Sequence, residues 1–205
     1  MIVNFKNSAL KKRCIFMDLE SSSLPKQRKE QIEKIVDGFL SDVDFKKVPY
    51  IDIVSMVQKD GFVVETHEMD IETTGCLFID ETDTDNPSRT IWVNTIFKNP
   101  DNEEDVVFKK SRFITAHEYG HYKLHQTLRA HRDTYHRKEQ IELEADYFAR
   151  SILMPLEYFR TCYETLRNFS SNDEKFVTTM LSKFFKVTKN KVNLRIKDLD
   201  ELKCI

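Results

Sequence analysis

Two histidines and a glutamate in the segment His117-Glu118-Tyr119-Gly120-His121 form an H-E-x-x-H motif. In a helix, His117 and His121 lie one turn apart, so both imidazoles leave the same face and can bind one metal ion. Glu118 then lies beside the metal and can take a proton from a metal-bound water, as in a zinc-dependent peptidase. So short a motif also recurs by accident in exposed helices. The surrounding chain must therefore decide between the two interpretations.

The residues around the motif favour a helix that is buried rather than exposed. Phe113, Gly120 and Leu124 fall on the same helical stripe as the two histidines. Gly120 costs about 1 kcal/mol relative to Ala inside a helix, and the usual compensation is close approach of another backbone or a ligand. Ser111 is a candidate N-cap, and no proline interrupts residues 110–154. This stretch therefore has room for two helices.

A catalytic zinc ion generally has three protein ligands, so a third donor is required. Two glutamates further along the chain compete for this role, Glu142 and Glu144. Helical periodicity places Glu142 and Asp146 on an inward face, whereas Glu144 shares its side with Tyr147 and Ser151 and should point outward. Carboxylates on an apolar face are costly unless they meet positive charge, which zinc supplies. We therefore predict Glu142 as the third ligand and Asp146 as the acceptor that fixes a histidine tautomer. The alternative is that both are ordinary solvated acids.

Other residues near the motif are candidates for further ligands or catalytic groups. A metzincin requires Gly at position 124 and His at position 127, but the sequence has Leu124 and Thr127, which excludes that class. His125 could reach the rim of the site, or it could be a capping or packing residue. His131 and His136 lie in the basic and polar connection that follows, where we expect them to be solvated. The alternative is that one of them, or the nearby Tyr135, polarises a scissile carbonyl, and the sequence does not choose between them.

Two blocks of sequence are more specific than the motif alone. The first is residues 112–125, and the second is residues 142–149 followed by Ile152-Leu153-Met154-Pro155. In order and spacing these blocks resemble the ImmA/IrrE family of metallopeptidases. The family often has Asn where this chain has Asp146, but Asp there matches the Glu-x-x-x-Asp pattern of the gluzincins. The resemblance implies a zincin-like fold with one zinc ion per chain, and Mn²⁺ is a possible substitute.

The composition is that of a globular chain. The 205 residues are 40% hydrophobic, and 32 basic against 34 acidic residues leave a net charge of −2. No global basic field attracts nucleic acid or anionic membrane. Four scattered cysteines argue against a cysteine zinc site or a disulfide scaffold and fit a reducing cytoplasm. No signal peptide or apolar run of about 20 residues is found, which predicts a cytoplasmic protein that is not membrane-bound.

The predicted fold class is α+β: a mostly helical, zincin-like metallopeptidase with a small three-stranded antiparallel sheet beside the active-site helix. A single domain is expected over residues 1–205, in four parts: N-terminal helices in 1–60, the sheet in 61–110, metal-binding helices in 111–168 and a C-terminal helical segment in 169–205. The expected N-terminal helices are 25–40 and 48–58, and the expected strands are 61–65, 75–80 and 90–95. In the resembled peptidases a sheet edge binds substrate as an added strand. Either 75–80 or 90–95 could do so here.

Residues 174–202 hold two apolar helical stretches with clustered lysines and Arg195. They could form a helix-turn-helix that reads DNA, or a helical pair that closes the domain. The leading functional prediction is a zinc-dependent endopeptidase with His117, His121 and Glu142 as ligands. Family resemblance implies a helix-turn-helix repressor of a mobile element or stress regulon as substrate. Two alternatives remain: a DNA-binding protein with a structural metal, or a metal-containing module that sequesters a repressor without cutting it.

Overall fold

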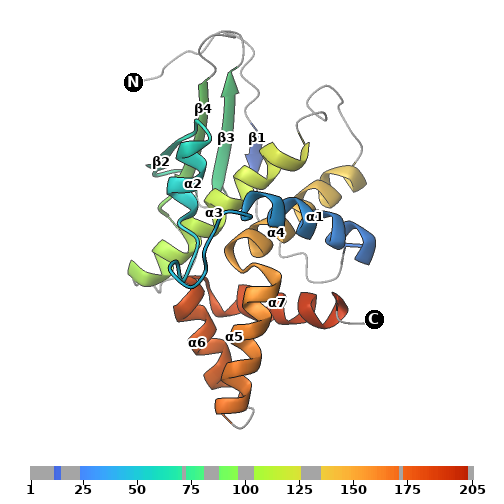
Figure 1. Cartoon of the computed structure of the whole chain (residues 1–205). Coiled ribbons are helices and arrows are strands. Elements are labelled where there is room, and N and C mark those ends of the chain that lie inside the picture. The colour runs from blue at the N-terminus through green and yellow to red at the C-terminus, as the bar shows by residue number, and fades with distance from the viewer. Residues whose placement is uncertain are drawn as a thin grey trace.

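The computed structural model describes residues 12–14, 24–70, 73–80, 88–96, 104–125, 135–170 and 173–202. Seven helices and four strands are found in these ranges (Figure 1). In chain order they are β1 (Lys12–Cys14), α1 (Lys26–Phe39), α2 (Ile53–Lys59), β2 (Val63–His67), β3 (Gly75–Asp80), β4 (Ser88–Asn94), α3 (Glu104–His125), α4 (Tyr135–Leu153), α5 (Leu156–Phe169), α6 (Glu174–Phe185) and α7 (Lys189–Leu202). The expected α+β, mostly helical class is confirmed. Within the described ranges, no helix has the length and apolarity needed to cross a membrane.

The sheet is mixed and four-stranded, not three-stranded and antiparallel as predicted. Its order is β1-β3-β4-β2. β3 runs antiparallel to both β1 and β4, but β2 runs parallel to β4. The predicted strands 61–65, 75–80 and 90–95 correspond to β2, β3 and β4, and β1 is the additional strand.

The connection from β2 to β3 explains the parallel pairing. The fully buried Asn94, at the end of β4, donates from Nδ2 to the carbonyl oxygens of Asp70 at 3.0 Å and Thr73 at 2.6 Å. Its Oδ1 accepts the backbone N–H of Met69 at 3.1 Å. The chain is thus held against the end of β4 as it passes to the other side, so β2 and β3 flank β4 instead of forming a hairpin.

Helix α3 runs through the middle of the molecule, with the sheet on one side and α4 on the other (Figure 1). Residues 112–122 are all buried, so the helix is covered all round rather than along one stripe. A Cβ on Gly120 would lie 2.9 Å from Cδ1 of Phe148 and 3.3 Å from the carbonyl oxygen of Ala145. The expected close approach of another backbone at Gly120 is confirmed, and it lets α3 and α4 cross tightly.

Two predicted helix starts are wrong. Helix α3 begins at Glu104, so Ser111 lies inside it and is not an N-cap; its carbonyl oxygen accepts from Oγ1 of Thr115 at 2.9 Å. Helix α2 begins at Ile53 rather than at residue 48. Pro49 disfavours the helical conformation for the residue before it, and the Asp52 side chain accepts from the Ser55 backbone N–H at 3.2 Å as an N-cap.

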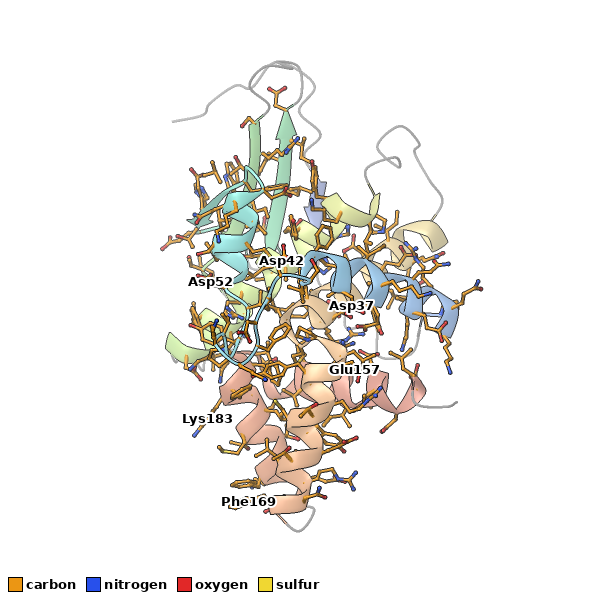
Figure 2. The ribbon with its side chains drawn as sticks, in the orientation of Figure 1. Asp37, Asp42, Asp52, Glu157, Phe169 and Lys183 are labelled. Carbon is orange, nitrogen blue, oxygen red and sulfur yellow. The ribbon has the colours of Figure 1, made fainter. Side chains whose placement is uncertain are left out.

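The C-terminal helices pack against the N-terminal helix and α4. Arg195 on α7 is fully buried and makes ion-paired hydrogen bonds to both carboxylate oxygens of Glu33 on α1, at 2.6 and 3.0 Å. Lys29 on α1 lies 3.0 Å from Asp198 on α7. Helix α7 therefore closes the helical part of the molecule, and its Arg195 is not on the surface. Lys183 on α6 does project outward, and Phe169 marks the tip of the α5–α6 pair (Figure 2).

Candidate metal centre

Three donor atoms from α3 and α4 converge at the predicted site. Nε2 of His117 and Nε2 of His121 lie 3.1 Å apart, and each lies 3.2 Å from Oε2 of Glu142. Ligand atoms on a tetrahedral zinc with bonds of about 2.0–2.2 Å are separated by about 3.3–3.5 Å. The three atoms therefore match one face of a zinc coordination tetrahedron. In the described part of the chain this group of residues could hold a metal ion.

The electrostatic environment of these donors favours a cation. Burial lowers the pKa of His117, but the carboxylates of Asp146, Glu142 and Glu118 outweigh it and raise this pKa to about 9. Burial raises the pKa of Glu142, but His117 and His121 outweigh it and hold the pKa well below its ordinary value. Glu142 therefore stays ionised. A site that stabilises positive charge on a buried imidazole also suits a divalent metal ion.

Asp146 lies beside Nδ1 of His117, the ring nitrogen on the side away from the donor cluster. Its Oδ1 is 3.6 Å from Nδ1 of His117, which is longer than a hydrogen bond. The carboxylate also lies 3.0 Å from Nη1 of Arg150 and 3.0 Å from Nζ of Lys191. These two cations lower the pKa of Asp146 against the effect of burial. The Asp146 carboxylate therefore lies between His117 and Lys191 of α7.

The prediction that Glu144 points outward is wrong. Glu144 is buried, and its Oε2 lies 2.6 Å from Nη2 of Arg28 and 3.1 Å from Nε2 of His125. Its Oε1 accepts from Gln140 at 3.0 Å. Burial raises the pKa of Glu144, but the hydrogen bonds from His125, Arg28 and Gln140 lower it to about 2. Helical periodicity correctly separated Glu144 from Glu142, but it could not show that α1 covers the second face.

His125 is buried beside His121 and does not lie at an exposed rim of the site. Its side chain is buried, and its Nδ1 lies 3.4 Å from Nδ1 of His121. The i, i+4 spacing from His121 was the available signal for this contact. The alternative carbonyl-polarising residues cannot be placed: His131 lies outside the described residues, as do the side chains of Tyr135 and His136.

Glu118 is fully buried and faces the start of β3. A Cβ on Gly75 would lie 3.0 Å from Oε1 of Glu118 and only 2.5 Å from Cγ2 of Ile114. The absence of a side chain at Gly75 therefore brings the strand backbone against the glutamate. The first residue of β3 and the motif helix together form one wall of the site.

Neither of the two strands considered for substrate binding lies at the edge of the described sheet. β4 pairs on one side with β3 and on the other with β2, so residues 90–95 do not form an edge. β3 has β1 on its outer side, with Cys14 opposite Gly75 and Lys12 opposite Leu77. The pairing with β1 therefore covers the part of the β3 edge nearest Glu118.

A helix with paired histidines, a carboxylate from a second helix and an adjacent strand make the arrangement expected of a metal-dependent peptidase. Sequence comparison agrees: residues 80–197 match the Peptidase M78 family, described as the IrrE N-terminal-like domain. The match covers more than half of the chain, and the protein belongs to this family, as the resemblance predicted. A search of curated proteins found no match.

Proposed function

We propose that the protein is a zinc-dependent endopeptidase, with His117, His121 and Glu142 as the zinc ligands and Glu118 as the general base. The observation that carries this proposal is the convergence of the three donor atoms to within 3.1–3.2 Å of one another. Membership of a peptidase family supports the reaction class. Two imidazoles and one carboxylate suit zinc, with manganese as a possible substitute.

A bound zinc ion would supply Lewis acidity, which polarises the scissile carbonyl and lowers the pKa of an attacking water toward neutrality. Glu118 follows His117 in the chain and is withdrawn from solvent. It accepts the proton of the attacking water and later donates it to the leaving amine. Asp146 keeps negative charge beside His117, which supports its position as a ligand.

An extended substrate would pair with the outer edge of β3. This edge begins at Gly75, whose backbone approaches Glu118. Adding a strand there would place a peptide bond near the general base and supply sequence-independent hydrogen bonds. β1 pairs with the same edge. The substrate would therefore either pair with the part of β3 that β1 leaves uncovered or displace β1.

The proposed substrate is an intracellular helix-turn-helix repressor of a mobile element or a stress regulon, as the family resemblance implies. A reducing cytoplasm is the proposed location. The half-buried Cys162 is a free thiol, which fits that compartment.

The decisive experiment compares the wild-type chain with Glu118→Gln, both loaded with zinc, on any helix-turn-helix repressor that is encoded beside this gene. Intact-mass spectrometry should show a single cut with the wild-type chain and none with the variant. Zinc content should be nearly the same in both, because Glu118 is not a ligand. Glu157→Gln, at an exposed site on α5, serves as the matched control and should cut normally.

If the repressor remains whole but binds both proteins equally, sequestration without proteolysis replaces the proposed function. If Glu118→Gln cuts as fast as the wild-type chain, the assignment of the general base is wrong.

A further inference from the structure

His125 is a buried titratable residue that the proposed mechanism does not use. It lies one helical turn beyond His121, and its ring contacts groups on both sides. Nδ1 faces Nδ1 of His121 at 3.4 Å, and Nε2 faces Oε2 of Glu144 at 3.1 Å. The ring therefore bridges a proposed zinc ligand and a carboxylate from α4.

The chemistry of these contacts determines where each proton must lie. As a zinc ligand through Nε2, neutral His121 carries its proton on Nδ1 and donates it. The facing Nδ1 of His125 must then be the acceptor, so the proton of His125 is on Nε2. That N–H points at Glu144, which as a carboxylate can only accept. Each hydrogen bond in the series has one donor and one acceptor, in one direction from His121 to Glu144.

Glu144 is itself held from the opposite side. Nη2 of Arg28 donates to the same Oε2 at 2.6 Å, and Gln140 donates to Oε1 at 3.0 Å. Arg28 belongs to α1, which lies outside the matched family region of residues 80–197. α1 is fixed in turn by the pairing of Glu33 with Arg195 on α7. The series thus connects His121 to a helix distant in sequence.

The two histidines of the motif differ in this respect. Oδ1 of Asp146 lies 3.6 Å from Nδ1 of His117, and this carboxylate is shared with Arg150 and Lys191. Nδ1 of His121 instead faces the ring of His125, and on the other side of that ring lies Oε2 of Glu144, which Arg28 also contacts. His121 thus contacts an acid through Nε2, which faces Glu142, and a second imidazole through Nδ1.

We propose that His125 and Glu144 are positioning residues for the ligand His121, and that Arg28 couples their geometry to α1. This inference rests on the proposed zinc site. The role of His125 and Glu144 is to fix the ring orientation and tautomer of His121, so that Nε2 of His121 presents its lone pair beside His117 and Glu142. Partners of this kind are typically worth about 10–100-fold in metal affinity.

The test measures zinc affinity by competition with a chromophoric chelator for the full chain and its variants. His125→Leu removes the acceptor while retaining an apolar side chain, and we expect zinc binding to weaken by about 10–100-fold. His125→Asn places an amide oxygen where Nδ1 stands, so it can still accept from His121 and should bind within a few-fold of wild type. The matched control is His67→Gln, at a partly exposed histidine on β2, which should bind as wild type does.

Arg28→Leu provides a second variant at a side chain that is 29% exposed and therefore less critical for folding. We expect a smaller but measurable loss of zinc affinity. Thermal unfolding of each metal-free variant reports whether the fold is intact. A role in packing alone would favour Leu over Asn, whereas a positioning role favours Asn over Leu.

The inference is overturned if the wild-type chain binds zinc and the Leu variant binds it equally well, or if Asn is no better than Leu. A wild-type chain that binds no zinc would overturn the proposed function and this inference together. These results are distinguishable because the wild-type affinity is measured first.

Discussion

Nε2 of His117 lies 3.2 Å from Oε2 of Glu142, although 25 residues separate them in the chain. The contact exists because α3 and α4 cross closely enough for a carboxylate on one helix to reach an imidazole on the other. The crossing depends on packing at Gly120 and on the helices that hold α4 from behind. The site is thus a property of the pair of helices.

Replacing Glu142 with Ala should abolish the stabilisation of the fold by zinc. A metal present at 100 times its dissociation constant stabilises the native state by about 2.7 kcal/mol, or roughly 5–10 °C in a chain of this size. Thermal unfolding with zinc and with a chelator should show that difference for the wild-type chain and for Glu157→Ala. Glu142→Ala should unfold at nearly the same temperature in both conditions; a full zinc shift in this variant would exclude Glu142 as a ligand.

Gly120→Ala and Gly38→Ala should have opposite effects on stability. Both positions lie inside helices, where Ala is favoured over Gly by about 0.5–1 kcal/mol. A Cβ at Gly38 meets nothing within 4 Å, so that variant should be more stable. A Cβ at Gly120 would press on Phe148 at 2.9 Å, and we expect a loss of about 1–3 kcal/mol.

Urea unfolding measures both free energies, and chelator competition should show that only Gly120→Ala weakens zinc binding. Equal effects of the two substitutions would mean that the crossing of α3 and α4 tolerates expansion.

The stability of the fold should depend on Glu33 in a pH-dependent way. Burial raises the pKa of Glu33, but Arg195, with hydrogen bonds from Tyr147 and Ser151, outweighs it and lowers the pKa below 4.5. A carboxyl with a lowered folded-state pKa contributes stability above its unfolded value, and that contribution is lost as the pH falls through the folded value. Glu33→Gln leaves Arg195 buried without its counter-charge and should cost about 3–5 kcal/mol near neutral pH.

Urea unfolding of the wild-type chain and Glu33→Gln across the acid range measures this difference. It should be largest near neutral pH and should shrink as the pH falls below 4.5. Glu157→Gln should show little difference at any pH. A gap between wild type and Glu33→Gln that widened on acidification would contradict the assigned direction of the shift.

Removal of residues 1–20 should lower KM for a peptide substrate and leave kcat nearly unchanged. β1 pairs with Gly75 to Leu77, the part of the β3 edge that a substrate strand would use. Competition by β1 raises the apparent KM by the inverse of the fraction of molecules with an open edge, roughly 10-fold if one molecule in ten is open. Steady-state kinetics on a fluorogenic peptide measures both constants. An unchanged KM in a truncated chain that unfolds at the normal temperature would show that substrate binds elsewhere.

Local spacing was sufficient to predict much of the candidate site. His117 and His121 share a face because residues four apart in a helix always do, whatever surrounds the helix. The same rule separated Glu142 from Glu144, and the structure places Glu142 beside both histidines. The close approach at Gly120 also followed from a local cost that needed compensation.

Only the tertiary structure decided what covers each face and which strands pair. Glu144 was predicted to point outward because the side it shares with Tyr147 was taken to face solvent, but Arg28, 116 residues earlier, covers that side. β2 pairs with β4 because buried Asn94 holds the connection from β2 to β3. Periodicity determines which residues share a face, since it depends on backbone geometry alone. The partner of that face depends on contacts between distant segments, and these depend on the fold as a whole.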